Sequence, residues 1–220
     1  MSYYPIFWDI ETTGLNPMIE PWSNWGDASQ VTAVGLGVVE NWHDSPETED
    51  AEITVKALYD SDEYRLLKLV RERVLDMVGE GEPILVGYNS RQYDHPYFTA
   101  RCGRKRLNPQ PFASEWKRLD MMRVAKEDDM IAKAYPKEDE YMEALGVTVD
   151  DPYDGSQMPK FFENREWDKI ETHVKGDVRG SVEMFLKRRD LMMDVFFDHY
   201  DINASGSPTP EVSFDELGRQ

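Results

Sequence analysis

Near its amino terminus the chain reads Phe7-Trp8-Asp9-Ile10-Glu11-Thr12-Thr13-Gly14, an apolar run followed directly by two acids and a turn. The apolar residues from Ile6 to Trp8 predict a buried strand that leads into two acids. Residues two apart on a strand point to the same face, so Asp9 and Glu11 are expected to project side by side. Adjacent carboxylates repel each other and are costly without a cation. The pair could be two solvated acids on an edge strand, but the apolar run before it and the Thr-Thr-Gly turn after it favour a metal site.

A second acidic position follows another buried strand, which is predicted over residues 83–88. The sequence at its end is Gly87-Tyr88-Asn89-Ser90-Arg91-Gln92-Tyr93-Asp94-His95-Pro96-Tyr97-Phe98. Asp94 falls near the start of a helix predicted over about 94–103. Taken alone, Asp94 could be the N-cap of this helix, and Asn89 could be a turn residue.

The third segment is His173-Val174-Lys175-Gly176-Asp177, which falls in a predicted helix. Residues i and i+4 share a helix face, so His173 and Asp177 are expected to point to one spot. Taken alone, they could be a salt-bridged pair on a surface helix. Gly176 costs about 1 kcal/mol relative to alanine in a helix interior. Its presence indicates that another group approaches the helix closely at this position.

The rest of the pattern predicts an α/β fold with a mixed central sheet and helices on both faces. The opening strands, at 6–10, 31–39 and from 53 onward, are expected to form a three-stranded meander. Helices are expected at 62–79, 121–135 and 138–145, a loop at 147–160, and a long broken helix at 166–199. We expect one domain over residues 1–200 and a flexible carboxy-terminal tail over 201–220.

Together, the three motifs resemble those of the DEDD superfamily of 3′–5′ exonucleases, which have a ribonuclease-H-like fold. The nearest likeness is to the proofreading exonuclease domain of family B DNA polymerases and to its free-standing relatives. The first motif is matched by Asp9-Ile10-Glu11-Thr12, the second by Gly87-Tyr88-Asn89 and Tyr93-Asp94-His95-Pro96-Tyr97, and the third by Asp177. The likeness runs from about residue 5 to residue 190.

This resemblance implies two Mg²⁺ or Mn²⁺ ions held by Asp9, Glu11, Asp94 and Asp177, with Asp9 bridging them. Hard divalent cations prefer oxygen ligands, and two of them can hold the attacking and the leaving oxygen of a displacement. The implied reaction is hydrolysis of terminal phosphodiesters of single-stranded DNA, which releases nucleoside 5′-monophosphates. The resemblance also implies that Thr12 and Asn89 bind the substrate.

One departure concerns His173. The tyrosine subfamily places its tyrosine four residues before the last aspartate, whereas the histidine subfamily places its histidine five residues before. Here a histidine occupies the four-before position. In a regular helix His173 takes the place of the tyrosine, and it could orient the attacking water or accept its proton. A bulge at Gly176 would change this geometry.

The amino-acid composition of the chain argues against several classes of protein. The 220 residues include 43 acidic and 25 basic side chains, with a net charge of −18 and one cysteine, Cys102. These values argue against a basic nucleic-acid-coating protein and a disulfide framework. No apolar run approaches the roughly 18 residues of a membrane span, and the first residues lack the pattern of a secretory signal. We therefore expect a soluble cytoplasmic protein.

The acidity is spread along a chain that is rich in aromatic residues. This pattern is typical of proteins from salt-loving archaea and their viruses, where molar salt shortens the Debye length to about 3 Å. An ordinary acidic protein is the alternative. Basic residues near the site could contact a nucleic acid, and the candidates are Arg91 and the cluster Arg101, Arg104, Lys105 and Arg106. The cluster could instead be the solvated end of a helix. Trp22 and Trp25 could stack a terminal base or pack their loop onto the core.

Three other interpretations stay open. The chain could be an exoribonuclease, a non-catalytic nucleic-acid-binding or polymerase-accessory module, or a protein in which metal only stabilises the fold. Single-stranded DNA is the favoured partner and RNA the second. Replication or repair proteins are further candidate partners, no membrane is expected, and the expected oligomeric state is a monomer.

Overall fold

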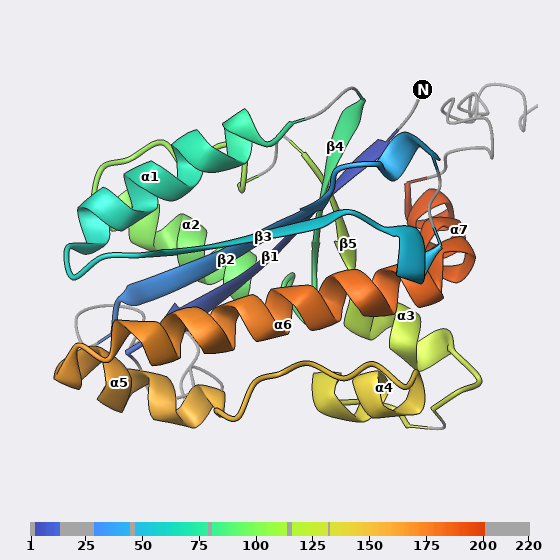
Figure 1. Cartoon of the computed structure of the whole chain (residues 1–220). Helices are drawn as coiled ribbons and strands as arrows, with labels where there is room; N and C mark the ends of the chain where they lie inside the picture. The colour runs from blue at the N-terminus through green and yellow to red at the C-terminus, as the bar shows by residue number, and fades with distance from the viewer. Residues whose placement is uncertain are drawn as a thin grey trace, which may run out of the picture.

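The computed structural model describes residues 3–13, 29–44, 47–78, 81–113, 116–131 and 133–200. Its strands form one mixed sheet in the order β3-β2-β1-β4-β5, with helices on both faces (Figure 1). The strands are β1 Tyr3–Thr12, β2 Val31–Val39, β3 Ile53–Tyr59, β4 Glu82–Gly87 and β5 Lys117–Asp120. The α-helices are α1 Glu63–Asp76, α2 Asp94–Arg104, α3 Met121–Glu127, α4 Glu138–Ala144, α5 Met158–Asn164, α6 Trp167–Lys187 and α7 Arg189–His199. Short 3₁₀ turns lie at η1 Trp42–Asp44, η2 Thr48–Asp50 and η3 Gly155–Gln157.

Strand β1 is the centre of the sheet. It pairs antiparallel with β2, which pairs antiparallel with β3, so the predicted meander is confirmed. On its other side β1 runs parallel to β4, but this pairing ends at Phe7 opposite Val86. The end of β1, from Asp9 to Thr12, therefore extends beyond β4. The loop after β4 can approach this free end.

Alternation along β1 divides its side chains between two cores. Ile6, Trp8 and Ile10 pack with residues of α1 and α2 on one face. Phe7 packs on the other face with residues of α6 that include Val178 and Phe185. Asp9 and Glu11 follow Phe7 at two-residue intervals. Both acids therefore fall on the face covered by α6.

Helix α6 lies unusually close to the sheet because β2 carries glycine where the two cross. A Cβ atom at Gly35 would lie 2.4 Å from Cγ2 of Val178 and 2.9 Å from the carbonyl oxygen of Val174. Gly35 is the β2 partner of Asp9. A side chain at this position would push the helix away from the sheet. The missing side chain thus lets the polar residues of α6 meet those of β1.

Two predicted boundaries differ from the structure. Helix α3 ends at Glu127 and not near residue 135, because Asp128 accepts hydrogen bonds from Arg188 and Tyr141 and the chain turns there. Helix α5 begins inside the predicted loop at 147–160. Its Pro159 lies in the first turn, where proline is compatible with a helix. The long carboxy-terminal helix is broken between α6 and α7, as predicted.

The predicted tail over 201–220 and most of the loop after β1 lie outside the described residues. Within the described part of the chain, no helix combines the length and the apolar character needed to cross a membrane.

Candidate active site

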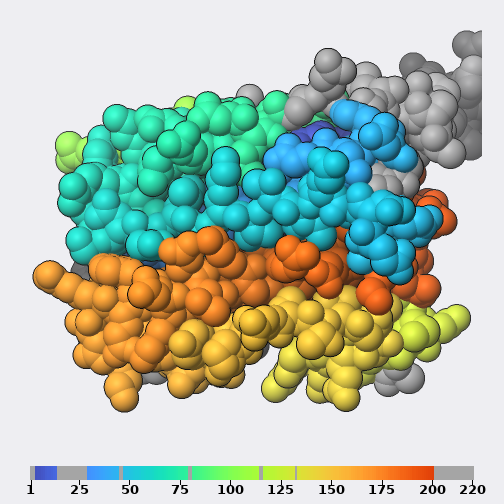
Figure 2. All heavy atoms as spheres, viewed as in Figure 1, coloured from blue at the N-terminus to red at the C-terminus, as the bar shows by residue number. Residues whose placement is uncertain are grey.

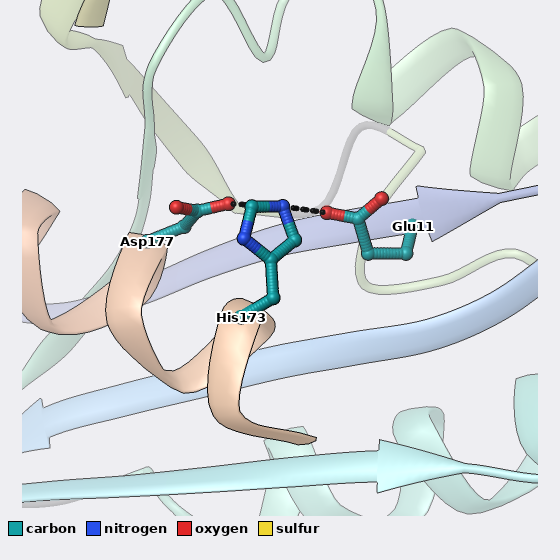
Figure 3. Close-up of side chains that lie close together, drawn as sticks. All are labelled: Glu11, His173 and Asp177. Carbon is teal, nitrogen blue, oxygen red and sulfur yellow. Dashed lines mark ion pairs between the residues drawn. The ribbon is translucent and has the colours of Figure 1, made fainter. Parts of the chain in front are cut away.

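Glu11, His173 and Asp177 form a close group at the end of β1 (Figure 3). Nε2 of His173 lies 3.2 Å from Oε1 of Glu11 and 3.3 Å from Oδ2 of Asp177. Helix α6 continues without a break through Gly176, so the four-residue spacing places both side chains on one face, as predicted. One candidate ligand atom from each of the three residues lies within 4.8 Å of the others. This group could hold a metal ion.

Asp94, on α2, lies near the same group of side chains at the end of β1. It is the first residue of that helix and is buried, and the N-cap residue is Tyr93. The alternative that Asp94 is an N-cap is therefore wrong. Burial and then the negative charge of Asp9 raise the pKa of Asp94 well above its usual value. The second motif thus adds a carboxylate beside the first.

The carboxylates of this site are held in an environment that opposes their ionisation. Burial and the charge of Glu11 raise the pKa of Asp9 to about 7, and burial and the charge of Asp9 raise the pKa of Asp177 to about 7. Burial also raises the pKa of Glu11. Carboxylates with raised pKa values in one cluster need a counter-charge, and hard divalent cations provide it. The donor set therefore fits the Mg²⁺ or Mn²⁺ ions that the motifs imply.

His173 supplies part of that counter-charge. Burial alone would lower its pKa, but the hydrogen bond to Glu11 and the negative charge of Asp177 raise the pKa to about 10. In the metal-free protein the imidazole is therefore protonated between carboxylates. Added divalent cations would take over this charge.

Asp151 is a site residue that the sequence did not reveal. It lies in the loop between α4 and η3, its side chain is 5 % exposed, and its Oδ2 is 2.6 Å from Nδ1 of His173. A Cβ atom on Gly176 would lie 2.8 Å from Cβ of Asp151. The predicted close neighbour of Gly176 is therefore this aspartate. Gly176 was the available signal, but nothing in the sequence identified the neighbour.

Glu138 is a sixth carboxylate near the site, after Asp9, Glu11, Asp94, Asp151 and Asp177. It is the first residue of α4, and its Oε1 accepts a hydrogen bond of 2.8 Å from Oγ of Ser181 on α6. Burial and then the charges of Asp177 and Asp9 raise its pKa well above the usual value. In the sequence this residue is hidden in the acidic run 137–140. No local spacing sets it apart from its solvated neighbours.

A cavity of about 580 Å³ opens beside these residues, between α4, the loop after it and α6. Figure 2 shows α4 and that loop lying alongside α5 and α6 on one face of the molecule. The cavity lining includes Glu138, Asp151, His173 and Asp177. Its volume is in the range of small-ligand pockets. The carboxylates are thus accessible from one side.

Thr12 and Asn89 lie at the edge of the site. Oγ1 of Thr12 is 3.1 Å from the hydroxyl oxygen of Tyr93, next to Asp94. Asn89 has φ of 53°, the left-handed conformation that asparagine tolerates, so it is a turn residue. Its backbone N–H donates to Oδ1 of Asp120, whereas its own Oδ1 is buried without a hydrogen-bond partner among the described residues. A contact of either side chain with substrate stays a prediction.

The predicted substrate role of the cluster at 101–106 is wrong for Arg101. This side chain is buried and binds Glu63 of α1 through Nε at 2.7 Å and Nη2 at 2.6 Å. Nζ of Lys105 lies 3.2 Å from the same carboxylate. These cations stabilise the contact between α1 and α2, at the end of α2 that is opposite Asp94. Trp22 and Trp25 lie outside the described residues.

The raised pKa values predict how pH and metal act on stability. A carboxylate or histidine whose folded-state pKa is raised stabilises the fold at low pH and loses that contribution as the pH rises. The metal-free protein is therefore expected to lose thermal stability between about pH 5 and pH 9. Because Mg²⁺ or Mn²⁺ binds the deprotonated carboxylates, saturating metal should remove this loss. Thermal unfolding at constant salt, with and without chelator, measures both effects. A metal-free melting temperature that is flat or rises over this interval would contradict the assignment.

The comparisons with known proteins agree with this geometry. The model of the RNase H superfamily matches residues 6–185, a region that contains every residue of the candidate site. A comparison with curated proteins found no match.

Solved structures share the fold. The family B DNA polymerase from the hyperthermophilic archaeon Pyrobaculum calidifontis matches with a TM-score of 0.60 at 15 % identity, over 84 % of this chain and 24 % of the polymerase chain. E. coli exonuclease I in complex with a dT13 oligonucleotide matches with a TM-score of 0.56 at 12 % identity, over 90 % of this chain and 43 % of the other. This chain thus spans less than half the length of either structure. The predicted ribonuclease-H-like fold is confirmed, and the chain belongs to the RNase H superfamily.

Proposed function

We propose that this protein is a metal-dependent 3′–5′ exonuclease that hydrolyses terminal phosphodiesters of single-stranded DNA and releases nucleoside 5′-monophosphates. The observation that carries the proposal is the convergence of Asp9, Glu11, Asp94 and Asp177 with His173 at the free end of β1. The pKa of each of the four carboxylates is raised. The superfamily assignment and the shared fold with a family B DNA polymerase and exonuclease I support the same reaction.

The four carboxylates would hold two divalent metal ions, Mg²⁺ or Mn²⁺. When bound, such ions supply positive charge for the attacking and leaving oxygens of the phosphodiester. They would also offset the repulsion between an acidic protein and a polyanionic substrate. No step therefore requires a cationic side chain in contact with the scissile phosphate.

His173 is the residue that would orient the attacking water and accept its proton. Its Nδ1 donates to Asp151, which fixes the ring and leaves Nε2 directed toward Glu11 and Asp177. A neutral imidazole held in this way could orient a water molecule at Nε2 and accept its proton. The pairing with a carboxylate favours the tautomer that this role needs.

A nuclease assay on end-labelled single-stranded DNA and RNA tests the proposal. The protein should be assayed with Mg²⁺ or Mn²⁺ and in molar KCl, since its diffuse negative charge supports a high-salt source. A 5′ label should yield a ladder that shortens one nucleotide at a time, and a 3′ label should yield only the mononucleotide. Faster degradation of RNA would instead identify an exoribonuclease. Binding without cleavage by folded protein with bound metal would indicate a non-catalytic module.

A further inference from the structure

Three arginines gather at the β5 edge of the sheet, in a chain whose net charge is −18. Arg91 follows β4, Arg118 lies on β5, and Arg123 lies on α3. All three line one small depression together with His199 of α7. Such a concentration of cations in an acidic protein needs a physical reason, because the cations repel one another.

The ring of His199 lies between two of these guanidinium groups. Its Nε2 is 2.8 Å from Nη1 of Arg91, and its Nδ1 is 2.7 Å from Nη1 of Arg123. A neutral imidazole has one acceptor nitrogen, so it can accept a hydrogen bond from only one of the two arginines. The other guanidinium therefore faces an N–H group. The Nη1 group of that arginine therefore has no acceptor on His199 and can donate to an anion.

Nearby carboxylates neutralise the cluster only in part. In the described part of the chain, no ion pair joins a carboxylate to the guanidinium of Arg91 or of Arg118. Nε of Arg123 lies 3.7 Å from Oε1 of Glu127, and this pair is exposed. Asp120 attracts the charge of Arg91, but it forms no ion pair with it, and its carboxylate accepts the backbone N–H groups of residues 89, 91 and 122. By contrast, Arg101 and Arg188 elsewhere in the fold form close ion pairs.

Aromatic rings lie beside these cations. A cavity of about 270 Å³ is lined by Arg91, Arg118, Trp116 and Tyr200, and by Lys117 with its ion-pair partner Glu82. Surfaces that bind single-stranded nucleic acid combine cations that follow the backbone with rings on which bases stack. We call Arg91, Arg118, Arg123, Trp116 and Tyr200 the β5-edge surface.

This surface begins next to the candidate active site. Arg91 precedes Asp94 by three residues, in the loop that leads from β4 to α2. The charge of Asp120, at the end of β5, contributes to the raised pKa of Asp94. The cations therefore start on the loop that leads to Asp94 and continue along the outer strand of the sheet. A strand whose 3′ end lies at Asp9 could continue over them.

We propose that the β5-edge surface binds the phosphate backbone of a single-stranded nucleic acid upstream of its 3′ end. The inference rests on the proposed function, because that function places the 3′ end at the carboxylates. The surface adds affinity that grows with strand length and weakens with salt. A substrate with a single phosphodiester gains nothing from it.

The test compares two double variants with the same change in charge. Arg91→Gln with Arg123→Gln removes two exposed cations of the surface, and Arg65→Gln with Arg73→Gln removes two exposed cations of α1. Fluorescence anisotropy measures the binding of an oligothymidylate of about 12 nucleotides, a length in the range of single-strand sites. KCl is varied up to about 1 M, which gives the slope of log affinity against log salt.

The surface variant should bind about tenfold more weakly at the lowest salt and lose about 1.4 of the salt slope, since each phosphate contact contributes about 0.7 on single strands. The α1 variant should bind like the wild type, and both should hydrolyse thymidine 5′-p-nitrophenyl phosphate at the wild-type rate. Equal affinities and slopes for the two variants would overturn the proposal, as would absence of binding by the wild type. If the wild type binds the oligonucleotide but hydrolyses no substrate, only the proposed function is overturned. The anisotropy measurement then still tests whether the surface binds nucleic acid.

Discussion

Replacing Asp9 by asparagine is expected to lower the rate of terminal phosphodiester hydrolysis by about 1000-fold, equivalent to about 4 kcal/mol in the barrier. The exchange keeps the shape of the side chain, and the backbone of residue 9 stays paired with Gly35 in the sheet. The carboxylate charge is lost at the position whose charge raises the pKa of both Asp94 and Asp177. A metal site that depends on this charge cannot form normally.

The same variant should be more stable than the wild type when metal is absent. Burial and repulsion raise the pKa of Asp9 to about 7, so its ionisation costs stability in the metal-free protein at pH 8. Thermal unfolding with chelator should therefore give a higher melting temperature for Asp9→Asn. Asp194→Asn, an exposed change on α7, serves as the control and should alter neither property. An Asp9→Asn protein that keeps more than a tenth of the wild-type rate would contradict the role of Asp9.

His173→Gln should lower kcat by about 100-fold or more, the usual contribution of a group that moves a proton. Asp151→Asn should lower kcat by about tenfold, as is typical when the partner that orients a site histidine is changed. If Asp151 acts on the reaction through its 2.6 Å contact with His173, the double variant should be no slower than His173→Gln alone. Asp150→Asn, on the exposed neighbour, should leave kcat unchanged.

Steady-state kinetics on a labelled oligonucleotide separate kcat from KM for these variants. A structural role of Asp151 would reduce stability and would add its own loss to that of His173→Gln. Additive losses in the double variant would therefore reject the positioning role. The ¹⁵N chemical shifts of the His173 ring report the tautomer independently of activity. They should change in Asp151→Asn and stay unchanged in Asp150→Asn.

Local spacing explains why much of the site could be predicted. Asp9 and Glu11 are two apart on a strand, and His173 and Asp177 are four apart on a helix, so short-range geometry fixes which side chains share a face. The buried strands and the meander follow from apolar runs that tertiary packing does not override. The continuous helix through Gly176 also followed from local pattern.

Tertiary contacts explain the rest. Asp151 and Glu138 reach the site from a loop and from a helix start, and in a chain with 43 acids no local feature sets them apart. Arg101 looked like a substrate contact because its partner, Glu63, lies on another helix. Helix α5 was hidden by Pro159, which usually breaks a helix but here lies in its first turn.

The most direct test of the central claim is hydrolysis of 5′-labelled single-stranded DNA in water enriched in oxygen-18, followed by mass spectrometry of the first product. Water that attacks the terminal phosphodiester becomes part of the released nucleotide. We predict that the first product is the 3′-terminal nucleoside 5′-monophosphate, that it carries one oxygen-18 atom, and that it forms about 1000-fold more slowly with Asp9→Asn. A first product that carries a 3′-phosphate, comes from the 5′ end, or forms equally with Asp9→Asn would contradict the account.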